Sequence, residues 1–234
     1  MNDVSTSEVQ QRFLRDGFVV VEGLGSTALL TAVNAEIRRH YASQRGDGMH
    51  ADFQQFQTEV ISWDPCHENN RTFCELRDMP RLQELTTDCL GAGWTASSSL
   101  VMLSPGGGKG QAWHQDCPPD NAQAFNLNRL FYTENVSAAD GAIVIVPGSH
   151  RLGRIPPGES QESLPGELVL EPRAGTLVLL HGHVFHRVTP NRTGKPRLSV
   201  NFRAFPLGIS PDICNVGIFR NTAYDFRAQH AVQR

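Results

Sequence analysis

A histidine and an aspartate stand one residue apart in the stretch QAWHQDCPPD, residues 111–120. Alternate residues of a strand point to the same face, so His114 and Asp116 would project together while Gln115 points away. One imidazole nitrogen and one carboxylate oxygen are two of the three protein ligands of a 2-His-1-carboxylate iron site, which leaves coordination positions open. Because such pairs also occur by chance, this hypothesis requires a second histidine from elsewhere in the chain.

The stretch LLHGHVFHRVTPN, residues 179–191, offers three candidates for that second histidine. They are His181, His183 and His186. His181 and His183 share a strand face by the period of two, and periodicity alone does not decide which of the three reaches the metal.

The chain as a whole resembles the phytanoyl-CoA dioxygenase family of iron(II)- and 2-oxoglutarate-dependent oxygenases. The resemblance rests on FLRDGFVVVEGL, WHQD, DGAIVIVPGSH and AGTLVLLHGHVFHRVTPN, and on an arginine eleven residues beyond the last histidine. In that family the distal ligand lies shortly before a Pro-Asn turn, which matches His186, and the arginine matches Arg197. The resemblance therefore implies Fe(II) bound by His114, Asp116 and His186, with 2-oxoglutarate and O2 as cosubstrates.

The implied role of Arg197 is to bind the far carboxylate of 2-oxoglutarate, since a guanidinium offers two parallel hydrogen bonds in the plane of a carboxylate. Family members often carry a serine two residues after the distal histidine as a second contact to this carboxylate. This chain has Val188 there, and Thr189 is the predicted substitute.

Five further residues are predicted to contact the substrate or to lie just behind the ligands. Ser199 and Asn201 share a strand face with Arg197, and His183 lies close to the distal ligand in sequence. Gln111 would turn inward only if a bulge intervened. Lys109 lies in SPGGGKGQ, a predicted hairpin or lid at the cavity mouth; Gly110 follows it where a Walker A loop requires Ser or Thr, so nucleotide binding is excluded.

The elements that must hold these residues fall into two parts. Helical patterns cover Ser5 to Gly17, a segment that begins at Ser26, and RLQELTTDCLG (81–91), with a buried strand FVVVEG between the first two. From about residue 96 short β-rich runs follow one another without helical periods. The fold class is therefore mainly β: a double-stranded β-helix, or jelly roll, with N-terminal helices packed on one sheet. We expect one domain over 1–234, with helical support and loops in 1–95, the jelly-roll core in 96–206 and a C-terminal extension in 207–234.

Two long connections, residues 48–70 and 149–166, interrupt this pattern. Connections of this length are often lids or binding loops, and simple surface insertions are about as common.

Composition narrows the partners. The 234 residues carry 21 basic and 24 acidic side chains without a basic stripe, so a nucleic-acid partner is not expected. No apolar run reaches the length of a membrane span and the N-terminus lacks signal-peptide features, which favours a cytoplasmic protein without a membrane partner. Five cysteines without a CxxC pair are typical of reduced thiols. The oligomeric state, monomer or homodimer, stays open.

The implied activity is hydroxylation of an unactivated C–H bond of a small molecule, with release of succinate and CO2. Asp116 argues against the halogenating branch of such enzymes, which replaces the carboxylate with a small residue. Desaturation, cyclisation and epimerisation are alternatives within the same chemistry. A cupin-like metalloprotein that does not use 2-oxoglutarate and a non-catalytic binding module are alternatives of other classes.

Overall fold

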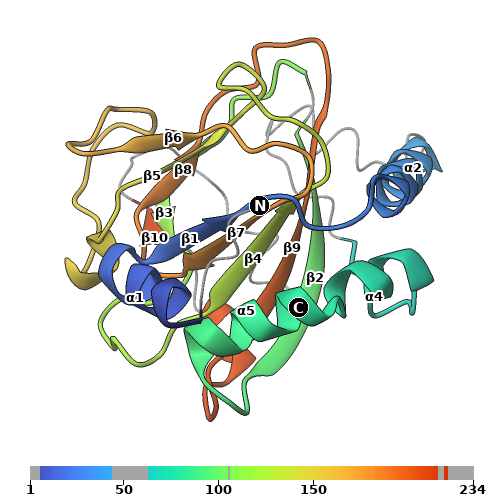
Figure 1. Ribbon diagram of the computed structural model, residues 1–234. Coiled ribbons are helices and arrows are strands. Elements are labelled where there is room, and N and C mark those ends of the chain that lie inside the picture. The colour runs from blue at the N-terminus through green and yellow to red at the C-terminus, as the bar shows by residue number, and fades with distance from the viewer. Residues whose placement is uncertain (1–5, 44–62, 105, 216–218, 221–234) are drawn as a thin grey trace.

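The computed structural model describes residues 6–43, 63–104, 106–215 and 219–220, and its strands form two five-stranded antiparallel sheets (Figure 1). In spatial order, the helix-covered sheet comprises β1 (Phe18–Val21), β7 (Thr176–His181), β4 (Leu127–Tyr132), β9 (Arg197–Phe205) and β2 (Thr95–Ser104). The second sheet comprises β10 (Phe219–Arg220), β3 (Gln111–Gln115), β8 (His186–Val188), β5 (Ile143–Ile145) and β6 (Leu168–Leu170).

Between β2 and β9 the chain crosses from one sheet to the other at nearly every step. Strands β2, β4, β7 and β9 belong to the helix-covered sheet, whereas β3, β5, β6 and β8 belong to the second. This alternation is the topology of a jelly roll, so the predicted fold class is confirmed.

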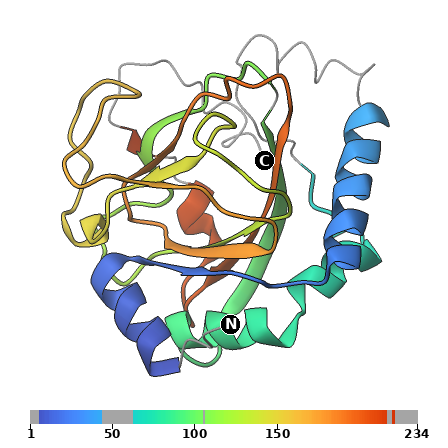
Figure 2. The same cartoon turned by 45° about the horizontal axis from the view of Figure 1, so that its top comes forward.

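The helices lie along the outer side of the helix-covered sheet (Figures 1 and 2). They are α1 (Thr6–Asp16), α2 (Thr27–Ser43), α4 (Arg71–Arg77) and α5 (Pro80–Leu90). One continuous apolar cluster joins buried residues of all four helices to the outward-facing residues of β2, β4, β7 and β9. The helices are therefore packed on one sheet, as the sequence predicts.

The end of α1 shows how local sequence sets this arrangement. Val9 and Phe13, one turn apart, are buried in the apolar cluster. Gly17 follows the helix with a φ of 77° and donates its N–H to the Phe13 carbonyl at 2.8 Å. A Cβ at this position would lie 2.5 Å from His150 Nδ1 and from Val184 Cγ2, so only glycine fits between the helix and the turn before β8.

Alternation along each strand separates an outer layer from an inner one. On β4, Leu127 and Phe131 face the helices, whereas Leu130 and Tyr132 belong to the apolar cluster between the two sheets. The polar residues of the candidate site lie on the same inner side, at one end of the barrel.

A third cluster covers the outer face of the second sheet. Trp113 and Phe185 of this face pack with Ile155, and the Trp113 indole N–H donates to the Glu162 carbonyl at 2.8 Å. The long connection after residue 149 therefore forms a cover on the far side of the sheet from the site, and Trp113 packs behind the site.

Three elements differ from the sequence expectation. Helix α4 was not predicted, and it begins directly after Asn70, whose side chain accepts hydrogen bonds from the N–H groups of Thr72 and Phe73. Strands β1 and β10 lie outside the predicted core, yet each forms an edge of a sheet. Both flanking regions therefore contribute to the jelly roll.

Four cysteines, Cys66, Cys74, Cys89 and Cys117, are free thiols in the described part of the chain. No helix among the described residues is both long enough and apolar enough to cross a membrane. Most of the predicted loop 48–70 lies outside the described residues.

Candidate metal centre

Two neighbouring strands bring the candidate ligands together. Strand β3 pairs with β8 in a register that sets His114 opposite His186, and their ring centroids are 4.1 Å apart. Asp116 follows the end of β3, and its main-chain N–H donates to the Gly182 carbonyl at 2.8 Å. A ladder between strands distant in sequence therefore gathers two histidines and a carboxylate at one point.

The ligand atoms converge closely. His114 Nε2 lies 3.8 Å from Asp116 Oδ1, and His186 Nε2 lies 3.7 Å from Asp116 Oδ2. One ligand atom from each of the three residues lies within 4.8 Å of the others, and among the described residues this is the one group with metal-ligand chemistry. All three side chains are buried, which keeps water from competing for them.

The outer nitrogens of both imidazoles are already engaged. His114 Nδ1 lies 2.8 Å from the Ala112 carbonyl oxygen, and His186 Nδ1 lies 2.9 Å from that of Val184. A carbonyl oxygen only accepts, so each Nδ1 carries a proton and each Nε2 is the nitrogen directed toward Asp116, where it is available to a metal. Two imidazole nitrogens and one carboxylate are a donor set that fits a divalent iron ion.

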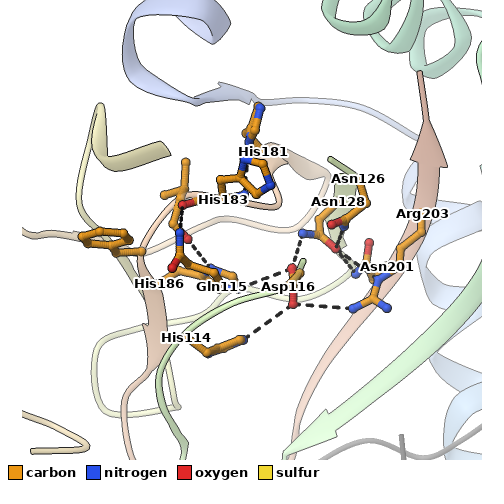
Figure 3. Close-up of polar contacts among 12 residues, drawn as sticks. His114, Gln115, Asp116, Asn126, Asn128, His181, His183, His186, Asn201 and Arg203 are labelled. Atoms are coloured by element: carbon orange, nitrogen blue, oxygen red, sulfur yellow. Dashed lines mark hydrogen bonds and ion pairs between the residues drawn. The ribbon is translucent and has the colours of Figure 1, made fainter. Parts of the chain in front are cut away.

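Asp116 stays ionised although it is buried. Burial raises the pKa of its carboxyl, but the charges of His186, Arg203 and His114 and a hydrogen bond from Asn128 outweigh burial and lower the pKa to about 2. Arg203 Nη2 lies 3.6 Å from Asp116 Oδ1 (Figure 3). The carboxylate is thus available as a ligand over the physiological pH range.

Arg197 lies at the start of β9, on the inner side of the barrel. It is buried and its Nη1 donates to Ser199 Oγ at 3.3 Å. The strand register places Tyr132 beside Ser199, and Ser104 of β2 directly opposite Arg197. Burial raises the pKa of the Tyr132 hydroxyl, and the nearby charge of Arg197 partly offsets this rise. A cation and three hydroxyls therefore share one buried region.

Two further residues predicted to contact substrate or 2-oxoglutarate, Asn201 and Thr189, have their polar groups in hydrogen bonds within the protein. Asn201 is on the same face of β9 and donates from Nδ2 to Asn128 Oδ1 at 2.8 Å. Thr189 has its hydroxyl engaged elsewhere, because it accepts from the Ala142 N–H at 2.9 Å and lies 3.1 Å from the Ala138 carbonyl oxygen. Its single proton is thereby used within the loop before β5, so in this conformation Thr189 has none to donate to 2-oxoglutarate.

His183 is buried in the loop between β7 and β8. Its ring meets Phe125 edge-on with centroids 6.3 Å apart, and its carbonyl accepts from Gln115 Nε2 at 2.9 Å. His181 stacks on Phe125 at 3.8 Å, and burial lowers its pKa to about 2. Both rings pack beside the site, and neither belongs to the group of three ligands.

Gln111 and Lys109 lie toward the other end of β3. The Gln111 carbonyl accepts from Gln161 Nε2 at 2.8 Å. Lys109 and Arg192 line a groove of about 430 Å³ between the glycine run and the turn after β8. None of the three candidate ligands lines this groove, so the structure does not bring Lys109 to them.

Sequence reasoning missed Asn128 and Arg203 as neighbours of the aspartate. Arg203 shares a face of β9 with Arg197 at even spacing, but nothing in the sequence pairs it with Asp116. Asn128 lies in β4, and the sequence does not show which face of that strand enters the barrel. The structure turns Arg129 outward, where its Nε donates to the Phe202 carbonyl at 2.7 Å.

A jelly roll with two histidines and a carboxylate gathered at one buried point defines a class of protein, the metal-dependent oxygenases built on this fold. The model of the phytanoyl-CoA dioxygenase (PhyH) family matches residues 13–199. The chain therefore belongs to the phytanoyl-CoA dioxygenase family, and the predicted resemblance is confirmed.

Curated relatives carry dioxygenase names. The chain is 27% identical over 234 residues to an Fe(II)/2-oxoglutarate-dependent dioxygenase, nvfF, of Aspergillus novofumigatus, which covers 92% of this chain and 76% of the relative. It is 25% identical over 227 residues to an ectoine dioxygenase of Nocardia farcinica, with coverage of 83% and 76%. The predicted class of activity, an Fe(II)/2-oxoglutarate-dependent dioxygenase, is confirmed.

Solved structures share the fold. HygX of Streptomyces hygroscopicus, with nickel and 2-oxoglutarate bound, aligns with a TM-score of 0.71 at 17% identity and covers 88% of this chain and 89% of its own. The epimerase SnoN, with Fe3+, alpha ketoglutarate and nogalamycin RO, aligns with a TM-score of 0.65 at 22% identity, covering 86% and 83%.

Proposed function

We propose that this protein is an Fe(II)- and 2-oxoglutarate-dependent oxygenase that hydroxylates an unactivated C–H bond of a small molecule, with His114, Asp116 and His186 as the metal ligands. The observation that carries the proposal is the convergence of their donor atoms within 4.8 Å in a buried site. When bound there, iron supplies the oxidising chemistry that couples decarboxylation of 2-oxoglutarate to attack on a C–H bond.

The chain's own part in this reaction is to bind and orient. The proton on each histidine Nδ1 fixes the ring and aims Nε2 at the site, as the contacts to Ala112 and Val184 require. Three protein ligands leave the remaining positions for cosubstrate and oxygen. Burial of the ligands excludes water, which protects the reaction from side products.

Arg197 is the proposed anchor of the far carboxylate of 2-oxoglutarate. It is a buried cation on the inner face of β9, two residues before Ser199, to which it donates. A buried guanidinium binds a carboxylate through two parallel hydrogen bonds. Because Val188 has no hydroxyl and that of Thr189 is engaged, Ser199 and Tyr132 are the better candidates for the second contact.

The epimerase and dioxygenase names among the similar proteins support a small molecule as the substrate, and they leave desaturation, cyclisation and epimerisation as alternative outcomes. Location in the cytoplasm, organisation as one domain and the absence of nucleic-acid or membrane partners stay predictions.

Anaerobic titration with Fe(II) and then 2-oxoglutarate tests the proposal. We expect a weak visible charge-transfer band from the ternary complex and, after air is admitted, succinate in proportion to the protein. His186→Ala and Asp116→Ala should both lose the band. A band that survives both changes would place the metal elsewhere. If the wild-type protein gives neither the band nor succinate, the proposed function is wrong.

A further inference from the structure

Asn128 connects the metal-binding aspartate to the rest of the barrel. It is a buried residue of β4, 2% exposed, and its Nδ2 donates to Asp116 Oδ2 at 2.5 Å (Figure 3). Its own oxygen accepts from three donors: Asn126 Nδ2 at 3.1 Å, Asn201 Nδ2 at 2.8 Å and Arg203 Nε at 3.3 Å. The amide is therefore held on both of its sides.

The polarity of this network is fixed by groups that can only donate. The main-chain N–H of Arg129 donates to Asn201 Oδ1 at 3.2 Å, so Asn201 must present its nitrogen to Asn128. The guanidinium of Arg203 likewise donates and never accepts. Both neighbours thus require the oxygen of Asn128 on their side, which leaves its nitrogen to face Asp116.

The two oxygens of Asp116 are then unequal. Oδ2 accepts the hydrogen bond from Asn128, whereas Arg203 Nη2 approaches Oδ1 only to 3.6 Å, beyond hydrogen-bond distance. Each oxygen also faces one imidazole, Oδ1 that of His114 at 3.8 Å and Oδ2 that of His186 at 3.7 Å, so the hydrogen bond from Asn128 is what distinguishes them. A carboxylate with both oxygens free could chelate a metal with both of them and occupy a position that cosubstrate or oxygen requires.

We propose that Asn128 is a positioning residue that reserves Oδ2 of Asp116, so that Asp116 binds the metal through Oδ1 alone. Asn201 acts through Asn128 by fixing the direction of its amide. This role revises the expectation that Asn201 contacts the substrate. The inference rests on the proposed function, because it assumes that Asp116 is a metal ligand.

The proposal is tested by titrating the metal-free protein with Mn(II) in a calorimeter. This measures the Mn(II) Kd and requires no catalytic turnover. Asn128→Leu keeps a side chain of similar size and removes the amide. We expect it to raise the Mn(II) Kd about 10- to 100-fold, the usual effect of losing a partner of a metal ligand. Asn201→Leu should raise the Kd by a smaller factor in the wild-type background and by less than about twofold in the Asn128→Leu background, because its effect passes through Asn128.

Arg187→Met is the matched control. Arg187 is another buried arginine, whose guanidinium lies over the Trp113 ring on the outer side of the second sheet. Its guanidinium donates to Gln161 and Glu167 on that outer side, so its loss should lower thermal stability and leave the Mn(II) Kd unchanged.

The outcomes separate this inference from the proposed function. If wild-type protein binds Mn(II) no better than His186→Ala, the metal site itself is wrong. If the wild type binds and Asn128→Leu binds equally well, only the role of Asn128 is overturned. Should Asn128→Leu fail to fold, Asn201→Leu decides, and an unchanged Kd in that folded variant overturns the proposal.

Discussion

At the scale of single residues, the site depends on one buried negative charge. Asp116 is ionised because two imidazoles, an arginine and an amide donor surround it, and each of these comes from a different strand or loop. The sequence predicts Asp116 and the two histidines from spacing and resemblance. It does not predict Asn128, because the contact of Asn128 with Asp116 joins β4 of the helix-covered sheet to the end of β3 in the second sheet and depends on how the two sheets pack.

Arg197→Ala should raise the concentration of 2-oxoglutarate required for half-maximal succinate release by roughly 100-fold or more, since a charge-assisted bidentate contact is worth about 3 kcal/mol. The Fe(II) requirement should change by less than about threefold, because Arg197 is not a metal ligand. Both requirements are measured by succinate assays at varied cosubstrate and varied iron.

Arg197→Lys and Ser199→Ala are the companions to this change. Lysine keeps the charge but not the planar pair of donors, so we expect it to restore only part of the binding. Ser199→Ala should have a smaller effect than Arg197→Ala. Equal loss of iron and 2-oxoglutarate binding in Arg197→Ala would contradict the assigned role.

At the scale of elements, long or strongly periodic segments were predicted well. Helices α1, α2 and α5 have apolar residues at helical spacing, and β9 has an apolar and polar alternation that survives in the structure. Helix α4 was missed because a segment of seven residues is too short to show a helical period. Strand β10 has two residues, and its place beside β3 arises from tertiary pairing that the sequence does not express.

The junction of α1 and β1 offers a direct test of packing. Gly17→Ala should destabilise the protein by more than the 1–2 kcal/mol that a left-handed backbone costs an ordinary residue, because the new Cβ would also meet His150 and Val184 at 2.5 Å. Chemical denaturation measures the free energy of unfolding.

Gly153→Ala is its control. Gly153 has a similar φ of 75°, but a Cβ there would meet nothing within 4 Å. The difference between the two variants therefore isolates the close contact. Equal losses would mean that the surroundings of Gly17 adjust freely.

The cover over the second sheet contributes stability without taking part in the site. Ile155→Ala removes a buried side chain from the cluster with Trp113 and should lower the free energy of unfolding by about 2–4 kcal/mol. The Mn(II) Kd should stay within about twofold of the wild type, because the cluster lies on the other face of the sheet.

Leu152→Ala provides the comparison on the same connection. Leu152 is 69% exposed, so its loss should change stability by less than about 0.5 kcal/mol. A large loss of metal binding in Ile155→Ala would instead indicate that the cover acts on the site as well.

At the scale of the whole molecule, the jelly roll uses its two faces differently. The outer side of the helix-covered sheet is apolar and packs against the helices. The space between the two sheets holds an apolar cluster in one region and buried polar residues around Asp116. The division appears in the sequence as alternating apolar and polar residues along the strands and as ligands at fixed spacing. These are the features by which the family is recognised from the sequence. Residues that bind substrates commonly lie on loops, which strand patterns do not encode.

A group of buried histidines should make the fold sensitive to acid. Burial lowers the pKa of His150, His181 and His183 below the value of about 6.5 that an unfolded histidine has. A group whose folded pKa is lowered binds its proton more readily in the unfolded chain. The stability contributed by its neutral form is therefore complete above pH 6.5 and is lost as the pH falls below that value.

His181 carries the clearest version of this prediction. The residue is 6% exposed, its ring stacks on Phe125, and its Nδ1 accepts from the His183 N–H at 3.1 Å. We expect His181 to lower the free energy of unfolding by up to about 1.4 kcal/mol per pH unit as the pH falls from 6.5 to 5. His181→Asn places an amide oxygen where Nδ1 was and keeps the acceptor without a group that titrates in this range. Denaturation of both metal-free proteins across this range gives the slope of the free energy of unfolding against pH. In the variant this slope should correspond to one fewer proton bound on unfolding. Parallel slopes would show that His181 does not gain its proton on unfolding, and the loss of stability in this range would then belong to His150 and His183.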